Sequence, residues 1–209
     1  MDFDVSVAVQ AFVTLLVIMD PLGTVPVFLA LTATEERSRR RRTAAHATLS
    51  AAVLVYLFAF FGAQILAALS IGLPALQIGG GVMLFLAALE MLSGDMLKPD
   101  AADGVNVAVV PLGVPLLAGP GAIAASMVLM ADVYSGATAS LALEAQLPVV
   151  VGVAATLAVV YLALRYSLFL ERLLGDNGIH LVTRVMGMLL LAIAVELTAS
   201  GVAAYVTST

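Results

Sequence analysis

The sequence predicts an all-α integral membrane protein whose six transmembrane helices form two inverted three-helix repeats. Of its 209 residues, 62% are hydrophobic and only 11% are charged, and the mean hydropathy is +1.11. A soluble domain has about 25% charged residues and at most about 50% apolar ones, so the solvent of this chain must be the bilayer. Six apolar segments use nearly the whole chain, which leaves no room for a second, water-soluble domain.

Short polar breaks separate the six apolar segments. The predicted spans are Val5–Ala33, Ala44–Leu69, Leu76–Leu92, Val107–Met130, Leu147–Leu170 and Ile179–Val206. A continuous helix over the first of them would be about 44 Å long, against about 30 Å of hydrocarbon. Pro21, Gly23 and Pro26 therefore predict that this first span breaks.

The basic residues predict how the chain is oriented. They fall on alternate connections, which the positive-inside rule assigns to the cytoplasm, so that both termini lie outside a multi-pass protein of the cytoplasmic membrane. Because topology explains the arginines, no nucleic-acid partner is expected. Residues 1–4 carry two acids and no base, unlike a signal peptide, so the first segment should remain in the membrane. The basic residues are Arg37, Arg39, Arg40, Arg41, Arg42, Lys98, Arg165, Arg172 and Arg184.

Two sequence motifs that recur in the same order indicate an internal repeat within the single transmembrane domain of residues 1–209. The stretch from Gly81 to Leu92 recurs 106 residues later, with Gly, Leu, Ala and Glu in register. The proline–glycine cluster of residues 20–26 recurs about 99 residues later at residues 119–121. The repeats cover about residues 1–97 and 104–209. Each has an odd number of spans, so the second is inverted, as in many secondary transporters.

The two proline–glycine clusters carry the strongest functional signal. Non-helical backbone survives in hydrocarbon only where protein or trapped water satisfies it, because each unpaired group costs several kcal/mol. A broken span also leaves a half-helix whose free N–H groups and dipole favour an anion. One half-helix should begin at Gly121, with Pro120 in its first turn, and its counterpart should begin at Thr24. The alternative is that these prolines are kinks or caps without a ligand.

A substrate site is therefore predicted near the midplane between the two broken spans. Asp20 could cap a helix, bind a cation, or do both, and the sequence does not choose. If it binds a substrate ammonium, the turn at residues 119–121 would bind the carboxylate, and small neighbours such as Ala124 and Ala125 would favour glycine, alanine, serine or threonine. The predicted substrate-binding residues are Asp20, Pro21, Gly23, Thr24, Gly119, Pro120, Gly121 and Ser126.

Glu90 and Glu196 occupy equivalent places in the third and sixth spans. An acid within the bilayer usually faces a cavity, pairs with a base or takes up a proton. With Asp20, these two residues are the candidates for coupling to H⁺ or Na⁺, although an acid near a span end could simply reach the interface.

Enzymatic chemistry is not expected. The chain has no cysteine, and no phosphate-binding loop, metal-ligand spacing or catalytic triad is present in the sequence. The two histidines, His46 and His180, lie near span ends and far apart in the sequence. We therefore expect no catalytic residue, no metal and no cofactor.

Four stretches of the sequence resemble the MarC/SnatA family of six-span bacterial and archaeal membrane proteins, which is placed near the LysE-type exporters. They begin at Asp20, Pro74, Pro111 and Arg184, and the Asp-Pro-x-Gly and Ala-Gly-Pro-Gly motifs are the most specific. The resemblance implies movement of small neutral amino acids such as glycine and alanine. Gln77, where relatives often have arginine, and Glu196, where they often have glutamine, depart from the family pattern and limit what it implies about coupling.

Two other functions share many of these features. A channel for small neutral solutes or ions would have the same broken helices but would show neither saturation nor counterflow. A non-transporting membrane scaffold would need a soluble partner-binding surface, and the short loops offer little of one. Faces of small residues such as Gly79–Gly81 are compatible with a homo-oligomer but do not set its size.

Overall fold

The computed structural model describes residues 4–93, 117–136 and 142–208, and every regular element in these ranges is an α-helix. Five helical segments are long and apolar enough to cross a membrane, and Pro120–Val133 is a shorter apolar helix. The all-helical membrane fold is thus confirmed. Residues 107–116 of the predicted fourth span lie outside the described residues. The five long segments are Val5–Leu29, Arg37–Ala68, Leu73–Ser93, Ala145–Arg165 and His180–Thr207.

The first span is broken, as predicted, into α1 (Val5–Met19) and α2 (Pro21–Leu31). The position of the break differs from the prediction. Asp20 alone leaves the helical conformation, and Gly23, Thr24 and Pro26 lie inside α2. The reason is that a proline at the first helical position has no N–H to satisfy and a suitable φ, so Pro21 starts a helix instead of interrupting one. Pro26 remains in α2 at the cost of one helical hydrogen bond.

Two other helix boundaries differ from the predicted spans. Helix α3 (Arg37–Ala68) begins seven residues before the predicted second span, so the arginine run forms its first turns. Helix α6 (Ala142–Arg165) is followed after one residue by α7 (Ser167–Ser208), where a loop over residues 171–178 was expected. Only Gly175, with φ 62° and ψ 174°, departs from helical geometry there.

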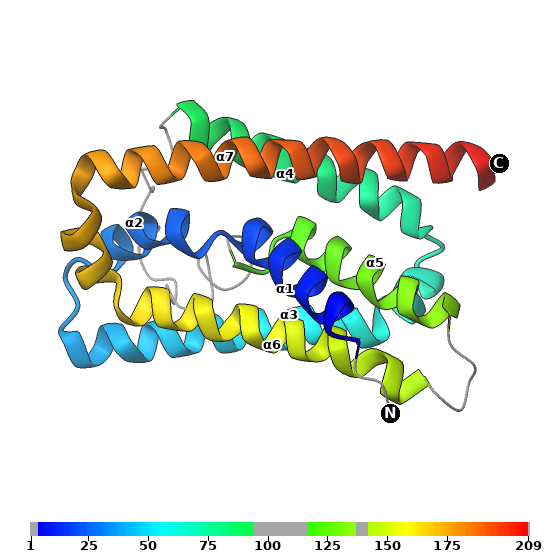
Figure 1. The fold of residues 1–209 in the computed structure, drawn as a ribbon, viewed down its shortest axis with the longest axis horizontal. Helices are drawn as coiled ribbons and strands as arrows, with labels where there is room; N and C mark the ends of the chain where they lie inside the picture. Colours follow the sequence, from blue (N-terminus) through cyan, green and yellow to red (C-terminus); the bar gives the residue numbers. More distant parts are fainter. Residues whose placement is uncertain (1–3, 94–116, 137–141, 209) are drawn as a thin grey trace.

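The helices run roughly along one long axis, and both termini lie at the same end of the molecule (Figure 1). The connection from α2 to α3 and the junction of α6 with α7 lie at the opposite end. The basic residues of these two connections therefore gather at the end away from the termini, which agrees with the predicted alternation of charge.

Small residues allow the helices to approach closely. The most extensive contacts join α4 (Leu73–Ser93) to α7 and α1 to α6, and α5 (Pro120–Gly136) packs on both α4 and α3. A Cβ on Gly81 of α4 would lie 2.9 Å from the Ala194 carbonyl oxygen of α7, and one on Gly152 of α6 would lie 2.6 Å from the Ala8 carbonyl oxygen of α1. Such glycine-mediated contacts are typical of helices packed in a membrane.

Large apolar side chains remain exposed along the outer faces of α3, α4 and α7. Examples are Val53 (59% exposed), Leu86 (50%) and Met188 (62%). In a membrane these faces meet lipid, which solvates them without cost. The buried core receives side chains from all seven helices, and its largest members are Leu15, Met19, Phe28, Leu117, Met130 and Leu164.

Candidate functional site

Asp20 ends one helix and begins the next. Its backbone is left-handed (φ 36°), and its N–H donates to the Leu16 carbonyl at 3.1 Å, which closes α1. Its Oδ1 accepts a hydrogen bond of 3.0 Å from the Gly23 N–H, so the carboxylate caps α2. Thr24 strengthens the turn, because its hydroxyl donates to the Asp20 carbonyl at 2.8 Å. The capping role that the sequence left open is therefore present.

The second carboxylate oxygen of Asp20 lies directly against the first turn of α2. A Cβ on Gly23 would collide with this Oδ2 atom and would lie 2.9 Å from the Met91 Cε. Glycine at this position thus lets a buried carboxylate, only 6% exposed, sit beside both the helix and the side chain of Met91. Among the described residues, Gly23 is the only one that donates a hydrogen bond to this carboxylate.

The N-terminus of α5 forms the other half of the site. Pro120 is the first helical residue, and the Ile123 N–H bonds to the Gly119 carbonyl at 3.1 Å. The N–H groups of Gly121 and Ala122 lie in the first turn, where no carbonyl of the same helix can accept their hydrogen bonds. Within the described ranges neither group donates a hydrogen bond. Gly119 offers no side chain to cap them, so these donors have no acceptor among the described residues. The predicted half-helix start at Pro120 and Gly121 is confirmed.

One cavity of about 120 Å³ joins the two turns. Asp20, Gly23 and Thr24 line it from the first span, and residues 119–122 line it from the fourth. Figure 1 shows both turns near the middle of the long axis, where α1 gives way to α2 and where α5 begins. A carboxylate and a helix N-terminus therefore face the same small space near the middle of the long axis.

Apolar side chains make up the rest of the cavity wall, and the sequence analysis did not assign them to the site. A signal was available, because Leu84, Ala87 and Met91 are spaced three and four residues apart and share one face of α4. That pattern is equally typical of core packing, so it could not identify a cavity. The apolar lining residues are Ile18, Met19, Met83, Leu84, Ala87, Met91, Leu117, Ala122 and Leu190.

Four of the predicted site residues do not line this cavity. Pro21 is buried and starts α2, and Ser126 is fully buried, with its hydroxyl donating to the Ile123 carbonyl at 2.8 Å. Glu90 and Glu196 are exposed on α4 and α7. Pro21 and Ser126 are predicted from the sequence to bind substrate, and neither lines this cavity, so their part in binding stays a prediction.

No group of three or more acidic or histidine residues that could hold a metal ion occurs in the described part of the chain.

Comparison with known proteins gives a consistent family assignment. The profile described as MarC family integral membrane protein matches residues 5–206. The chain is 34% identical over 206 residues to the UPF0056 membrane protein MJ1677 of Methanocaldococcus jannaschii, covering 95% of this chain and 97% of the relative. It is 33% identical to a UPF0056 membrane protein of Aquifex aeolicus, covering 92% and 91% of the two chains. It is 30% identical to the UPF0056 membrane protein YhcE of Escherichia coli, covering 96% and 94%.

No solved structure matches the chain at a significant level. The family profile covers both broken spans and all the residues around the cavity, from Ile18 to Leu190. The relatives match over nearly their whole length, so the correspondence is not confined to one motif. The protein is a member of the MarC family of integral membrane proteins.

Proposed function

We propose that this protein is a secondary transporter of small neutral amino acids, such as glycine and alanine, which works by alternating access across the cytoplasmic membrane. Both termini would lie outside the cell. The observation that carries the proposal is the cavity in which the Asp20 carboxylate and the uncapped N-terminus of α5 meet.

The charges of this cavity complement an amino acid zwitterion. A helix N-terminus carries about half a positive charge. At α2 the carboxylate of Asp20 offsets that charge, whereas at α5 Gly119 has no side chain that could do so. A substrate carboxylate would therefore accept hydrogen bonds from the Gly121 and Ala122 N–H groups, as anions do at other helix N-termini. The ammonium group would pair with the second oxygen of Asp20.

The size and polarity of the cavity favour a small substrate. Its volume of about 120 Å³ is well below the ~300–1,000 Å³ of typical drug-sized sites. Met91 lies against Gly23, and Leu84 lies against Gly121. Both would contact a short apolar side chain of the substrate. This wall would accept the hydrogen of glycine or the methyl of alanine more readily than a large or charged side chain.

The helix packing supports the inverted repeat that alternating access needs. The third span (α4) packs on the sixth (α7), the first (α1) on the fifth (α6), and the second (α3) on the fourth (α5). A two-fold axis that exchanges the halves would leave the first pairing unchanged and would interconvert the other two. Leu84 and Leu190, which are 106 residues apart, both line the cavity, as do Ile18 and Leu117, which are 99 apart. An axis through the cavity would let the site open to either side in turn.

Coupling to H⁺ or Na⁺ would centre on Asp20, because this acid lies in the cavity, whereas Glu90 and Glu196 are exposed outside it. A proton or a sodium ion on the second oxygen of Asp20 would compete with the substrate ammonium or accompany it. Flux measured with and without each ion gradient separates these two arrangements.

Counterflow in proteoliposomes tests the proposal. Vesicles loaded with unlabelled glycine or alanine should accumulate the labelled amino acid from outside, with an initial rate that saturates. Lysine and glutamate should not support this exchange. Flux that rises linearly with concentration and shows no counterflow would instead identify a channel, and the absence of any flux above that of empty vesicles would count against transport of these solutes.

A further inference from the structure

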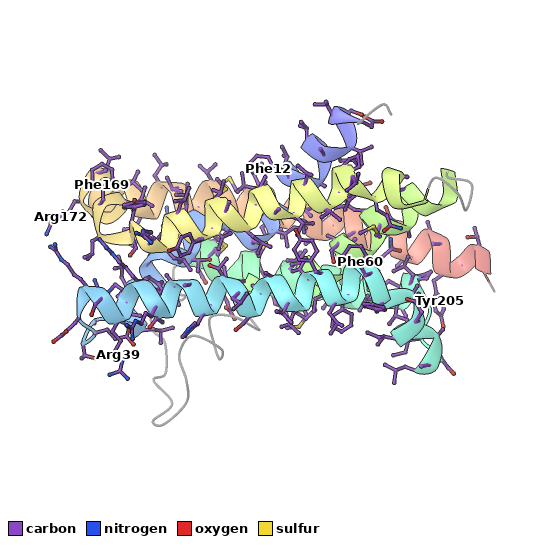
Figure 2. The ribbon with its side chains drawn as sticks, turned by 90° about the horizontal axis from the view of Figure 1, so that it is seen from below. Phe12, Arg39, Phe60, Phe169, Arg172 and Tyr205 are labelled. Carbon is purple, nitrogen blue, oxygen red and sulfur yellow. The ribbon has the colours of Figure 1, made fainter. Side chains whose placement is uncertain are left out.

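A second pocket lies at the end of the molecule opposite the termini and is strongly basic. Its volume is about 220 Å³, and its walls come from the start of α3 and from the junction of α6 with α7. Figure 2 shows Arg172 and Phe169 at this end, where Arg39 also lies. The described residues that line it are Arg37, Arg40, Arg41, Arg165, Tyr166, Ser167, Leu168, Phe169 and Arg172, none of which is acidic.

No acid among the described side chains lines the pocket beside these arginines. Arg165 donates a hydrogen bond of 2.5 Å to the Tyr161 hydroxyl and lies over the rings of Tyr161 and Tyr166, at 5.7 and 5.9 Å from their centroids. These contacts hold the guanidinium in place but leave its charge. The nearby acid Glu35 accepts a hydrogen bond of 2.8 Å from the Thr43 hydroxyl and does not line the pocket.

Arg40 lines the pocket and has one buried donor without a partner among the described residues. Its Nη2 donates to the Thr32 carbonyl at 2.8 Å, which fixes the side chain in the wall of the pocket. Its Nε is buried and has no hydrogen-bond partner among the described residues. A buried donor without a partner is unfavourable, and an anionic oxygen in the pocket would satisfy it.

The position of the pocket favours a lipid as the source of that oxygen. Arg37 begins one candidate membrane span and Arg165 ends another, so the pocket lies at a membrane boundary. Tyr166 and Phe169, which are 51% and 63% exposed, lie beside the arginines, as interfacial aromatic residues do. One part of the pocket wall is thus basic and the other part is apolar. The basic part suits a charged lipid headgroup, and the apolar part suits the adjoining ends of its acyl chains.

We propose that this pocket binds the phosphate of an anionic phospholipid on the cytoplasmic side of the membrane. Guanidinium groups pair with phosphate oxygens in fork geometry, and basic pockets between transmembrane helices bind anionic headgroups. The phosphate would bridge the start of α3 to the junction of α6 with α7. These segments come from different predicted repeats, so the lipid would fix the two halves to each other at this end.

The test compares two double variants of the same helix. Arg37→Gln with Arg41→Gln removes two charges that line the pocket, and neither side chain has a hydrogen-bond or ion-pair partner among the described residues. Arg39→Gln with Arg42→Gln removes two charges that do not line the pocket. Each full-length protein is purified in neutral detergent and titrated with short-chain phosphatidylglycerol, while its thermal unfolding and the retained lipid in native mass spectra are followed. Phosphatidylcholine and inorganic phosphate are titrated separately.

The wild type and the control double variant should retain phosphatidylglycerol equally and gain the same thermal stability from it. The pocket double variant should bind it roughly 30-fold more weakly, which corresponds to about 2 kcal/mol for two arginines. Arg172→Gln, which alters the other wall, should weaken binding as well. Equal loss in both double variants would show general charge attraction and overturn the proposal. Equal stabilisation by phosphatidylcholine, or binding of inorganic phosphate as tight as that of the lipid, would overturn it too.

Discussion

At the residue scale, Asp20 combines a structural and an electrostatic role. Its backbone ends α1 and its Oδ1 caps α2, while its Oδ2 lies beside the cavity wall at Met91. Local chain chemistry made this residue predictable, because an acid before a proline is a typical helix start. Leu84 and Met91 were not predictable as site residues, because only the packing of α4 against α5 and α7 brings them to the cavity.

Replacing Asp20 separates its two roles. Asp20→Asn should leave the thermal stability nearly unchanged, because asparagine caps helices as well as aspartate does. Asp20→Ala should lose about 1 kcal/mol of stability, since the Gly23 N–H then has no acceptor. Thermal unfolding of the two variants in the same detergent measures the difference. Equal stability of the alanine and asparagine variants would contradict the capping role.

Gly121 tests the other half of the site. A Cβ there would collide with the side chain of Leu84, which would be displaced into the cavity. Gly121→Ala should therefore weaken exchange of glycine and alanine, with the larger loss for alanine. Gly79→Ala is the matched control, because a Cβ at Gly79 meets no atom within 4 Å. Equal exchange rates in the two variants would show that Leu84 does not limit the site.

At the scale of elements, the sequence predicted the helices well but placed several of their ends wrongly. Hydropathy marks where a helix enters lipid, whereas the helix itself continues as far as its hydrogen bonds allow, so α3 starts at Arg37 and not at Ala44. Proline was a misleading guide in the first span, because it starts α2 at Pro21 and is tolerated inside the helix at Pro26. Close glycine contacts then hold these helices together.

The contact of α1 with α6 should be sensitive to one methyl group. At Gly152 a Cβ would lie 2.6 Å from the Ala8 carbonyl oxygen and 2.8 Å from the Ala11 Cβ, so the helices would have to separate. Gly152→Ala should therefore lower stability by about 1–3 kcal/mol, as overpacking does elsewhere. Chemical or thermal unfolding in detergent measures this, with Gly79→Ala again as the control. A variant as stable as wild type would mean that α1 and α6 are not so tightly packed.

At the scale of the whole molecule, both termini lie at one end and the arginine-rich connections at the other (Figure 1). The proposed orientation places the arginine end in the cytoplasm. The sequence predicted this arrangement through charge alone, since the positive-inside rule does not require knowledge of helix packing. That both broken spans line one cavity could be inferred only from the internal repeat. The residues of one proline–glycine cluster do not determine that the other cluster lies beside it.

Single cysteines test the orientation, because the chain contains none of its own. Ser38→Cys, exposed at the start of α3, should react with a membrane-impermeant maleimide only after the membrane is opened. Thr207→Cys, exposed near the end of α7, should react in intact spheroplasts. The reverse pattern would invert the proposed topology, and labelling of both sites from one side would contradict the fold.

The most direct test of the account is equilibrium binding of labelled glycine and alanine to the purified protein, compared between Asp20→Asn and Glu196→Gln. Both variants replace an acid by its amide, but only Asp20 lines the cavity, whereas Glu196 is exposed on α7. Loss of a charge-assisted hydrogen bond costs about 1.5–3 kcal/mol, so Asp20→Asn should bind roughly 10- to 100-fold more weakly, and Glu196→Gln should bind like wild type. Undiminished binding by a folded Asp20→Asn variant would show that the cavity between the two broken helices is not the substrate site.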